Sequence, residues 1–442
     1  MNLIMKKLYI FLLIVLSFVS TNVFSQTEAF FSQTMATSIR SINNNGLGLG
    51  AAKYFDYNTK TYTPQESSLG VSLLNVINDN ADVAGEMKLS GTSNKVPAFR
   101  AYSKEWKEIG VFPEFLFGKS SFTVFDYSEN GKYIVGQMSK RIDDKDVYGS
   151  FIYYTETGEL KPIFNEKYTA LAVYTINNDG LMAGWVDDSG LNGGTRRIPC
   201  TIDQDLTIKY IDNKLPTSAV SDIMKINTNG LMAGEWEGLP MIYNYKTGER
   251  KSIKIYEGFY AGAFEDISDN GIAIGYMTTL NTANQLVREA IIWHESFGDQ
   301  VKLLSDFVKK EGLKIDTFDG LMGTALTISN NGKYIGGYDN SAFNFARGWV
   351  IKLDEKLLGL NKNQLAKVSI NVFPTLVSST LNISSDKTID NYKINTIDGK
   401  LIQQVELHRN NAQINIHYLP KGVYLITIQS NNQVKTVKFI KQ

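Results

Sequence analysis

Seven segments of the chain repeat one order of residues: a turn rich in Asn, Asp and Gly, then a short apolar run without polar alternation. The turns are "SINNNG", "VINDNA", "DYSENG", "TINNDG", "KINTNG", "DISDNG" and "TISNNG", and they end at residues 46, 81, 131, 180, 230, 271 and 332. Asn and Asp bond their own backbone in such turns, and Gly adopts positive φ without a steric penalty. Each turn therefore predicts a tight reversal into an inner strand buried on both faces.

A glycine closes most of these apolar runs, which indicates that another backbone segment approaches closely there. The closing residues are Gly85, Gly136, Gly184, Gly234, Gly275 and Gly336. One turn carries Ala81 where the other six have Gly, so we expect that turn to be of another type or mildly strained.

The spacing of the turns predicts the architecture. Successive copies lie 35 to 61 residues apart, and periods of about 40 to 50 residues belong to propellers and solenoids. A third strand and a more polar fourth strand follow several copies, as in "SFIYYTETGELKPI". A four-stranded antiparallel meander is one propeller blade. We expect an all-β protein with a seven-bladed β-propeller over residues 26–355, although six to eight blades fit the pattern, with ring closure pairing strands from both ends.

The repeat resembles the extracellular HAF-repeat family. The segments "ISNNGKYIGGYDNSAFNFARGWV" and "INNDGLMAGW" carry the resemblance, which covers roughly residues 36–355. It implies a secreted β-propeller and no defined activity.

A second domain is expected after a linker at 356–367. Residues 368–442 contain short strands at the spacing of a small β-sandwich. The segments "VFPTLVSSTLNI", "YKINTIDGKLI", "YLPKGVYLITI" and "VKFIKQ" resemble the type A C-terminal sorting domain of the type IX secretion system of Gram-negative bacteria. Thr375 and Leu376 depart from the family's usual Asn-Pro. A carbohydrate-binding or spacer sandwich is the alternative. The residues that carry the sorting motif are Pro374, Gly399, Leu419, Gly422, Tyr424 and Lys441.

The sorting resemblance implies an export route and partners. It implies translocation across the outer membrane by the type IX machinery, removal of the domain by a sortase-like peptidase, and then release or surface attachment. Residues 1–25 read independently as a secretory signal peptide, with cleavage between Ser25 and Gln26. A membrane anchor is the alternative, but the apolar run is shorter than the roughly 20 residues of a spanning helix.

Composition removes several function classes. The chain has 45 basic and 45 acidic residues, so no net charge attracts nucleic acid or an anionic membrane. Cys200 is the single cysteine and cannot pair within the chain, and we interpret it as a packing residue. His408 and His417 lie in the sorting domain, which leaves His294 as the propeller's one histidine. A histidine-rich metal site or a Ser-His-Asp triad is therefore not favoured.

Three further groups of residues each have a functional and a purely structural interpretation. The acidic segments 141–146 and 185–190 suit either a glycosidase carboxylate pair or solvated loops. The Asn- and Asp-rich turns suit either calcium or the turn geometry itself. The tryptophans suit sugar stacking or, as we favour, core packing, and they are Trp106, Trp185, Trp236, Trp293 and Trp349.

We therefore expect a non-enzymatic binding or scaffolding propeller without a cofactor. Loops of unequal length at 137–149, 185–197 and 276–289 are expected to form the recognition surface for an extracellular protein or glycan. A carbohydrate-active enzyme with its site in the central cleft is the alternative, and an adhesin is a third possibility. Two carboxylates, or a Tyr with an Arg, that converge in the top-face pocket would favour the enzyme.

Overall fold

The computed structural model describes residues 27–50, 53–64, 71–88, 95–101, 105–110, 122–142, 145–192, 196–212, 214–217, 220–341, 346–354, 370–397, 400–430 and 433–442. The chain divides into two compact units, Met1–Gly359 and Leu360–Gln442. The signal peptide, its cleavage site Ser25–Gln26 and the linker at 356–367 lie outside the described residues, so these assignments remain predictions.

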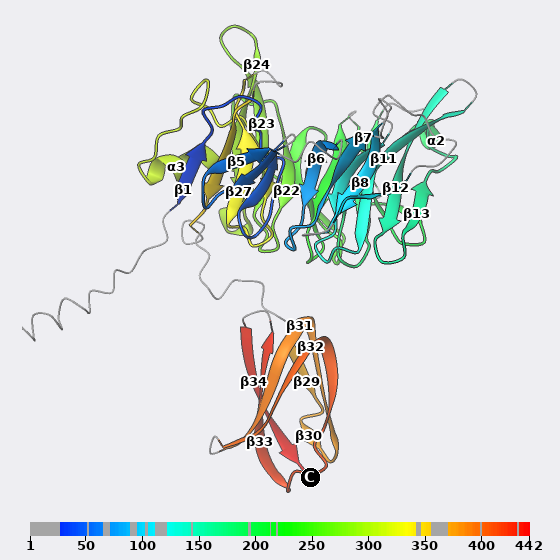
Figure 1. The fold of residues 1–442 in the computed structure, drawn as a ribbon, viewed down its shortest axis with the longest axis vertical. Coiled ribbons are helices and arrows are strands. Elements are labelled where there is room, and N and C mark those ends of the chain that lie inside the picture. Colours follow the sequence, from blue (N-terminus) through cyan, green and yellow to red (C-terminus); the bar gives the residue numbers. More distant parts are fainter. Residues whose placement is uncertain are drawn as a thin grey trace, which may run out of the picture. The chain divides into compact units, whose positions relative to one another are not determined.

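Seven four-stranded antiparallel sheets make up the described part of the first unit, which confirms the seven-bladed propeller (Figure 1). The first three blades are β2 (Ser41–Ile42), β3 (Leu47–Gly50), β4 (Lys53–Asp56) and β5 (Thr61–Pro64); β6 (Val71–Ile77), β7 (Val83–Lys88), β8 (Lys95–Arg100) and β9 (Lys107–Glu108); and β10 (Phe122–Tyr127), β11 (Tyr133–Ile142), β12 (Lys145–Tyr154) and β13 (Glu159–Ile163). The next three are β14 (Leu171–Ile176), β15 (Met182–Asp187), β16 (Arg197–Ile202) and β17 (Ile208–Tyr210); β18 (Ser221–Ile226), β19 (Leu231–Trp236), β20 (Leu239–Asn244) and β21 (Glu249–Ser252); and β22 (Ala261–Ile267), β23 (Ala273–Leu280), β24 (Leu286–Trp293) and β25 (Lys302–Leu303).

The seventh blade closes the ring with a strand from the other end of the propeller. It consists of β26 (Thr324–Ile328), β27 (Tyr334–Tyr338), β28 (Gly348–Lys352) and β1 (Glu28–Phe31). The blue strand β1 lies in the same sheet as the yellow strand β27 in Figure 1, and it pairs antiparallel with β28. The predicted closure with strands from both ends is confirmed.

The apolar run after each turn is the second strand of its blade, one place further from the axis than we predicted. The strand before the turn is innermost, because residues of β2, β6, β10, β14, β18, β22 and β26 line the central cavity. The second strand is still buried on both faces, since it packs against the innermost strand of the next blade, as β15 does against β18.

The closing glycines allow the close backbone approach that the sequence predicted. A Cβ atom at Gly184 would overlap the carbonyl oxygen of Ala172 on the neighbouring strand β14. The same overlap with innermost-strand backbone would occur in the other blades that carry such a glycine. In the seventh blade, however, the equivalent residue is Gly337 and not Gly336, because this copy, like the third, has five and not four residues from the turn glycine to the closing glycine.

In the described part of the propeller, short helices lie in three connections, and they are α2 (Ser189–Asn192), the 3-10 helix η2 (Glu295–Phe297) and α3 (Leu304–Lys310). Among the described residues, no helix is long and apolar enough to span a membrane.

The described residues of the second unit form one six-stranded sheet around their own core. Its strands are β29 (Ile370–Phe373), β30 (Leu376–Val377), β31 (Thr380–Thr396), β32 (Leu401–Asn415), β33 (Gly422–Ser430) and β34 (Gln433–Lys441). All pairs are antiparallel except β30 with β34. Alternate residues such as Tyr424, Ile426 and Ile428 point into the core, as the period of a half-buried strand requires.

Candidate functional site: the central channel

A bulge recurs at the same place in the innermost strands. In six blades the register with the second strand shifts across one residue, three positions before the third residue of the turn segment, as Tyr174 stands before Asn177 in "TINNDG". A bulge re-aims the extra side chain. The extra residue of each of these six bulges, together with Arg40 at the same position in the first blade, lines a cavity of about 520 Å³ on the axis. We call them the bulge ring: Arg40, Asn75, Phe125, Tyr174, Met224, Glu265 and Leu326.

The next residue along the strand connects one blade to the next. The Thr175 hydroxyl accepts a hydrogen bond from the backbone N–H of Ile226 at 3.1 Å. The Asp126 carboxylate likewise accepts from the N–H of Ile176 at 3.0 Å. Equivalent bonds from the next blade reach Ser41 and Asp266. These polar side chains therefore hold the ring together at the channel wall.

The third residue of each six-residue turn segment explains why the turn sequence recurs. Asn227 Oδ1 accepts from the N–H groups of Asn229 and Leu231, and its Nδ2 donates to the carbonyl of Ser268 in the next blade at 2.8 Å. Across the copies this position always holds a side chain that bonds its own turn. We call these residues the turn ring: Asn43, Asn78, Ser128, Asn177, Asn227, Ser268 and Ser329.

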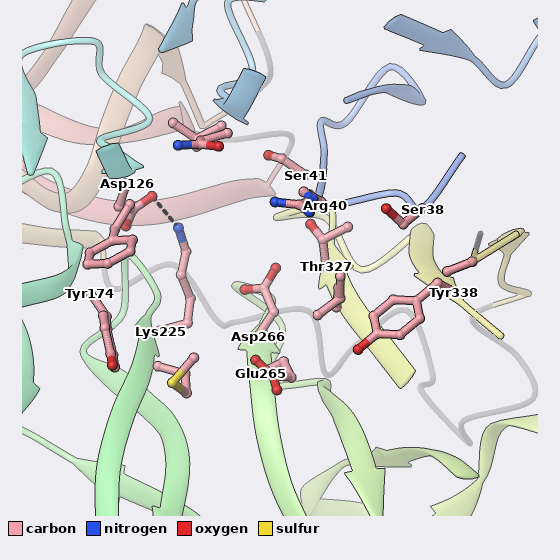
Figure 2. Close-up of a pocket in the computed structure, with 16 residues that line it drawn as sticks. Ser38, Arg40, Ser41, Asp126, Tyr174, Lys225, Glu265, Asp266, Thr327 and Tyr338 are labelled. Atoms are coloured by element: carbon pink, nitrogen blue, oxygen red, sulfur yellow. Dashed lines mark hydrogen bonds and ion pairs between the residues drawn. The ribbon is translucent and has the colours of Figure 1, made fainter. Parts of the chain in front are cut away.

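A buried ion pair crosses the channel wall. Lys225 Nζ lies 2.7 Å from Asp126 Oδ1, two blades away in the ring (Figure 2). Burial opposes the positive charge, but Asp126, Asp266 and Glu129 together raise the pKa of Lys225 above its usual value. Burial raises the pKa of Asp266, against the opposing effect of Lys225. Lys225 therefore remains charged and neutralises part of the acidic lining.

A second group of charges lies at the end of the channel away from the turns. Asp222 on β18 faces Glu235 on β19 across the sheet, and Glu265 projects from β22 of the next blade. Burial and the neighbouring Asp222 raise the pKa of Glu235 to about 8 and that of Glu265 to about 7. Burial also raises the pKa of Asp222. The three carboxyls therefore act on one another, as close acids do.

Two arginines accompany these acids. Arg197 Nη1 lies 2.9 Å from Asp222 Oδ2, and its guanidinium stacks 4.8 Å from the centre of the Trp185 ring. The Arg288 guanidinium stacks 3.8 Å from the centre of the Tyr276 ring. We call Asp222, Glu235, Glu265, Arg197 and Arg288 the mouth cluster.

The acidic loop at 185–190 is structural. Asp187 accepts hydrogen bonds from the backbone of Thr169 and Ala170, and Asp188 pairs with Arg196 at 2.7 Å. The side chains of 141–146 lie outside the described residues. In the described part of the chain, no group of three or more His, Cys, Asp or Glu side chains is placed to hold a metal ion. Calcium binding at the Asn- and Asp-rich turns stays an alternative hypothesis to the expectation of no cofactor.

The single cysteine, the one histidine of the propeller and three of the tryptophans also occupy structural positions. Cys200 is fully buried, and burial raises the pKa of its thiol to about 12. His294 caps η2, since its Nδ1 accepts from the N–H of Ser296. Trp236, Trp293 and Trp349 are buried, as expected of core residues.

In the second unit, the described motif residues contribute to packing and turns. Leu419 and Tyr424 are buried, and the Tyr424 hydroxyl donates to the carbonyl of Pro420 at 2.9 Å. Lys441 Nζ donates to the carbonyl of Gln442, Gly422 opens β33, and Pro374 follows β29. Gly399 lies outside the described residues.

Sequence reasoning missed the bulge ring and the mouth cluster. A signal was present, because each bulge residue stands three places before a recognisable turn residue. The mouth cluster had no comparable signal, since it joins Arg197, Asp222 and Glu265 from three different blades.

Comparison with known proteins assigns the second unit. Residues 371–442 match the secretion system C-terminal sorting domain family. This match indicates a secreted or cell-surface protein of a Bacteroidetes bacterium that interacts with the type IX secretion machinery. The predicted secretion from a Gram-negative bacterium is thereby confirmed. No curated protein matches the sequence.

Several solved structures are similar to the chain at low identity. An oligogalacturonate lyase in complex with manganese is 10% identical with a TM-score of 0.48, and the match covers 76% of this chain and 98% of that one. TolB from Acinetobacter baumannii is 10% identical with a TM-score of 0.37, covering 88% and 82%. PorZ, a surface component of the type IX secretion system of Porphyromonas gingivalis, is 9% identical with a TM-score of 0.25, covering 92% and 82%.

Proposed function

We propose that the protein is a secreted or cell-surface binding module of the HAF-repeat type, non-enzymatic, whose ligand enters the central channel. One observation carries this proposal: the seven copies keep similar residues in the turn ring but seven different residues in the bulge ring. The turn ring, which supports the fold, is filled by Asn or Ser in every blade. Seven different side chains around one cavity instead suit an asymmetric ligand.

The long loops support entry at the mouth cluster. The described hairpin β23–β24 and the connection β15–β16 with α2 both join a second strand to a third strand. In an antiparallel meander these connections lie at the end opposite the turn ring, which is also the end of Asp222 and Glu235. We therefore place the recognition surface where the loops and the mouth cluster meet.

The second candidate is a carbohydrate-active enzyme, hydrolase or lyase. The observation that favours it is the convergence of Glu235 and Glu265 beside Arg288 and Tyr276. A carboxyl group with its pKa near neutral can donate a proton to a leaving group, as general acids in such enzymes do.

A screen of glycans and peptides with the purified protein tests the binding proposal. Met224→Trp and Leu326→Trp each fill the channel from a different blade, and Tyr245→Trp places the same indole side chain at an exposed position. We expect ligand binding to be lost in both channel variants and kept in Tyr245→Trp, with all three unfolding near the wild-type temperature. Ligands that bind all variants equally would place the site elsewhere.

Assays for new reducing ends or unsaturated products separate the two candidates. Turnover that Glu235→Gln or Glu265→Gln abolishes would establish the enzyme and overturn the non-enzymatic role. Binding without product would support the binding module.

A further inference from the structure

Two carboxyl groups of the mouth cluster have no partner of their own. No hydrogen bond or ion pair joins the carboxylates of Glu235 and Glu265 to another described side chain. Both groups are half-buried, and Glu265 lines the central cavity. Each acid also experiences the negative charge of Asp222, which the positive charge of Arg288 opposes in part. A positive group between them would relieve the repulsion among the three carboxylates.

Asp222, the third acid of the mouth cluster, also has an oxygen without a hydrogen-bond partner among the described residues. Asp222 is only 2% exposed, and its Oδ2 pairs with Arg197. Its Oδ1 is buried without a hydrogen-bond partner among the described residues. Buried acceptors are rarely left unpaired, and those that are call for an explanation. A donor supplied by a ligand would satisfy it.

The cations nearby are held by other groups. Lys225 pairs with Asp126 and Arg197 with Asp222. Arg288 lies over the Tyr276 ring and forms no ion pair with a described side chain, and its buried Nε has no hydrogen-bond partner there. The mouth cluster therefore presents unsatisfied acceptors on its acids together with one unsatisfied donor on Arg288.

Resting on the binding function proposed above, we propose that the mouth cluster binds a primary ammonium group with a hydrogen-bond acceptor beside it, the chemistry found at the amino terminus of a peptide. The ammonium lies between Glu235 and Glu265 and supplies the donor that Asp222 lacks. The adjacent carbonyl oxygen accepts from Arg288. An ammonium group has three donors, which matches three carboxyls.

A sugar is a poorer match for this surface. Stacking on a pyranose ring needs an open aromatic face, but guanidinium groups already cover one face of Trp185 and one face of Tyr276. A neutral hydroxyl group would also leave the mutual repulsion of the acids in place. An amino sugar offers the same ammonium with a neighbouring hydroxyl, so it is a separate arm of the test.

Four probes titrated into the purified protein distinguish these ligands: triglycine amide, N-acetyl-triglycine amide, glucosamine and N-acetylglucosamine. We expect triglycine amide to bind and its acetylated form to bind at least about tenfold more weakly, because acetylation removes the charge. Glu235→Gln and Glu265→Gln should each weaken binding by about tenfold, since each removes one carboxylate. Glu249→Gln is the matched control, because it removes an exposed carboxylate from the same blade as Glu235.

The pH profile adds a readout that a purely structural role would not give. Affinity should be highest near pH 7 to 8 and fall on both sides, because the two acids gain protons below that range and an amino terminus with a pKa of about 8 loses its proton above it. A flat profile, or equal binding of the acetylated probe, would overturn the proposal. Binding of glucosamine alone would overturn the peptide assignment.

The experiments distinguish failure of the ammonium proposal from failure of the proposed binding function of the channel. Ligands that Met224→Trp and Leu326→Trp exclude, but that carry no amine, would keep the channel as the binding site and overturn only the ammonium proposal. Triglycine amide that binds all channel variants equally would overturn both.

Discussion

In each of the seven copies the turn-ring residue stands three positions after the bulge-ring residue. The two rings differ in how much their residue types vary between the copies. Every turn-ring residue is Asn or Ser, while no two bulge-ring residues are alike. A turn-ring side chain bonds backbone N–H groups in its own blade, and Asn43, Asn78 and Asn227 also bond the next blade. A bulge-ring side chain faces the cavity. The nearly uniform turn ring therefore stabilises the turns and the contacts between blades, and the variable bulge ring faces the cavity.

The largest expected effect comes from breaking the uniform part of the repeat at Gly184. The Cβ of Gly184→Ala would overlap the carbonyl oxygen of Ala172, and strand β14 cannot move without disturbing the blade. We expect a loss of about 3 kcal/mol in the free energy of unfolding. Urea unfolding followed by tryptophan fluorescence measures this effect in the propeller alone, because all five tryptophans lie there.

Met224→Ala in the bulge ring is the matched control. Met224 is half-buried against the cavity, so its loss should cost about 1 kcal/mol or less. Equal losses in both variants would contradict the division between uniform and variable positions.

Asn227→Ala tests the turn ring itself. The substitution removes two hydrogen bonds within the turn and one to Ser268 of the next blade, from a residue that is 3% exposed. We expect a loss of about 2 kcal/mol in the same assay. Asn227→Ser should recover part of it, because other copies use Ser at this position. A serine variant no more stable than the alanine variant would show that only the bond to the next blade matters.

Much of the fold could be predicted from the sequence because the turn ring is a local feature. Asn177 bonds N–H groups two and four residues ahead, so its own neighbours identify it. The spacing of such turns then indicated seven blades. Strand order within the blade could not be predicted in full, since burial on both faces suits an inner and a second strand equally. The position of Gly337 was missed for the related reason that one inserted residue shifts the register.

The candidate site could not be predicted, because its residues meet only after the ring closes. Lys225 and Asp126 are 99 residues apart in the chain, and nothing near either residue indicates the other. Carboxylates beside a Tyr and an Arg do occur at the mouth cluster, but of these residues only Glu265 lines the described central cavity. These residues came from β19, β22, β23 and β24 rather than from the acidic loops.

The acids of the mouth cluster should make the propeller less stable as pH rises. Burial and Asp222 raise the pKa of Glu235 to about 8 and that of Glu265 to about 7, against about 4.3 in an unfolded chain. The folded state therefore binds more protons between about pH 5 and pH 8, so the free energy of unfolding falls across this window and then levels off.

Glu235→Gln should make the decrease in the free energy of unfolding between about pH 5 and pH 8 smaller by about 1 to 2 kcal/mol. The effect is no larger because solvent partly screens the half-buried carboxyl group. Unfolding by urea at pH 5, 6.5 and 8 measures the slope, and Glu249→Gln should leave it unchanged. A Glu235→Gln slope equal to that of the wild type would mean that Glu235 ionises normally in the folded protein.

The smallest expected effect concerns Ala81, the one turn that departs from the repeat. Ala81 has φ of 62° where Gly180 has 78°, so the turn keeps its geometry and the side chain is strained. Ala81→Gly should relieve about 1 kcal/mol of strain, partly offset by the greater freedom of Gly in the unfolded chain. A net gain of about 0.5 kcal/mol is expected, measured as a higher urea midpoint. The reciprocal Gly180→Ala should lose about 1 kcal/mol at a turn of the same geometry. Destabilisation by Ala81→Gly would mean that packing of the Ala81 methyl against the apolar cluster of Leu49, Leu74, Ile77 and Val83 outweighs the strain.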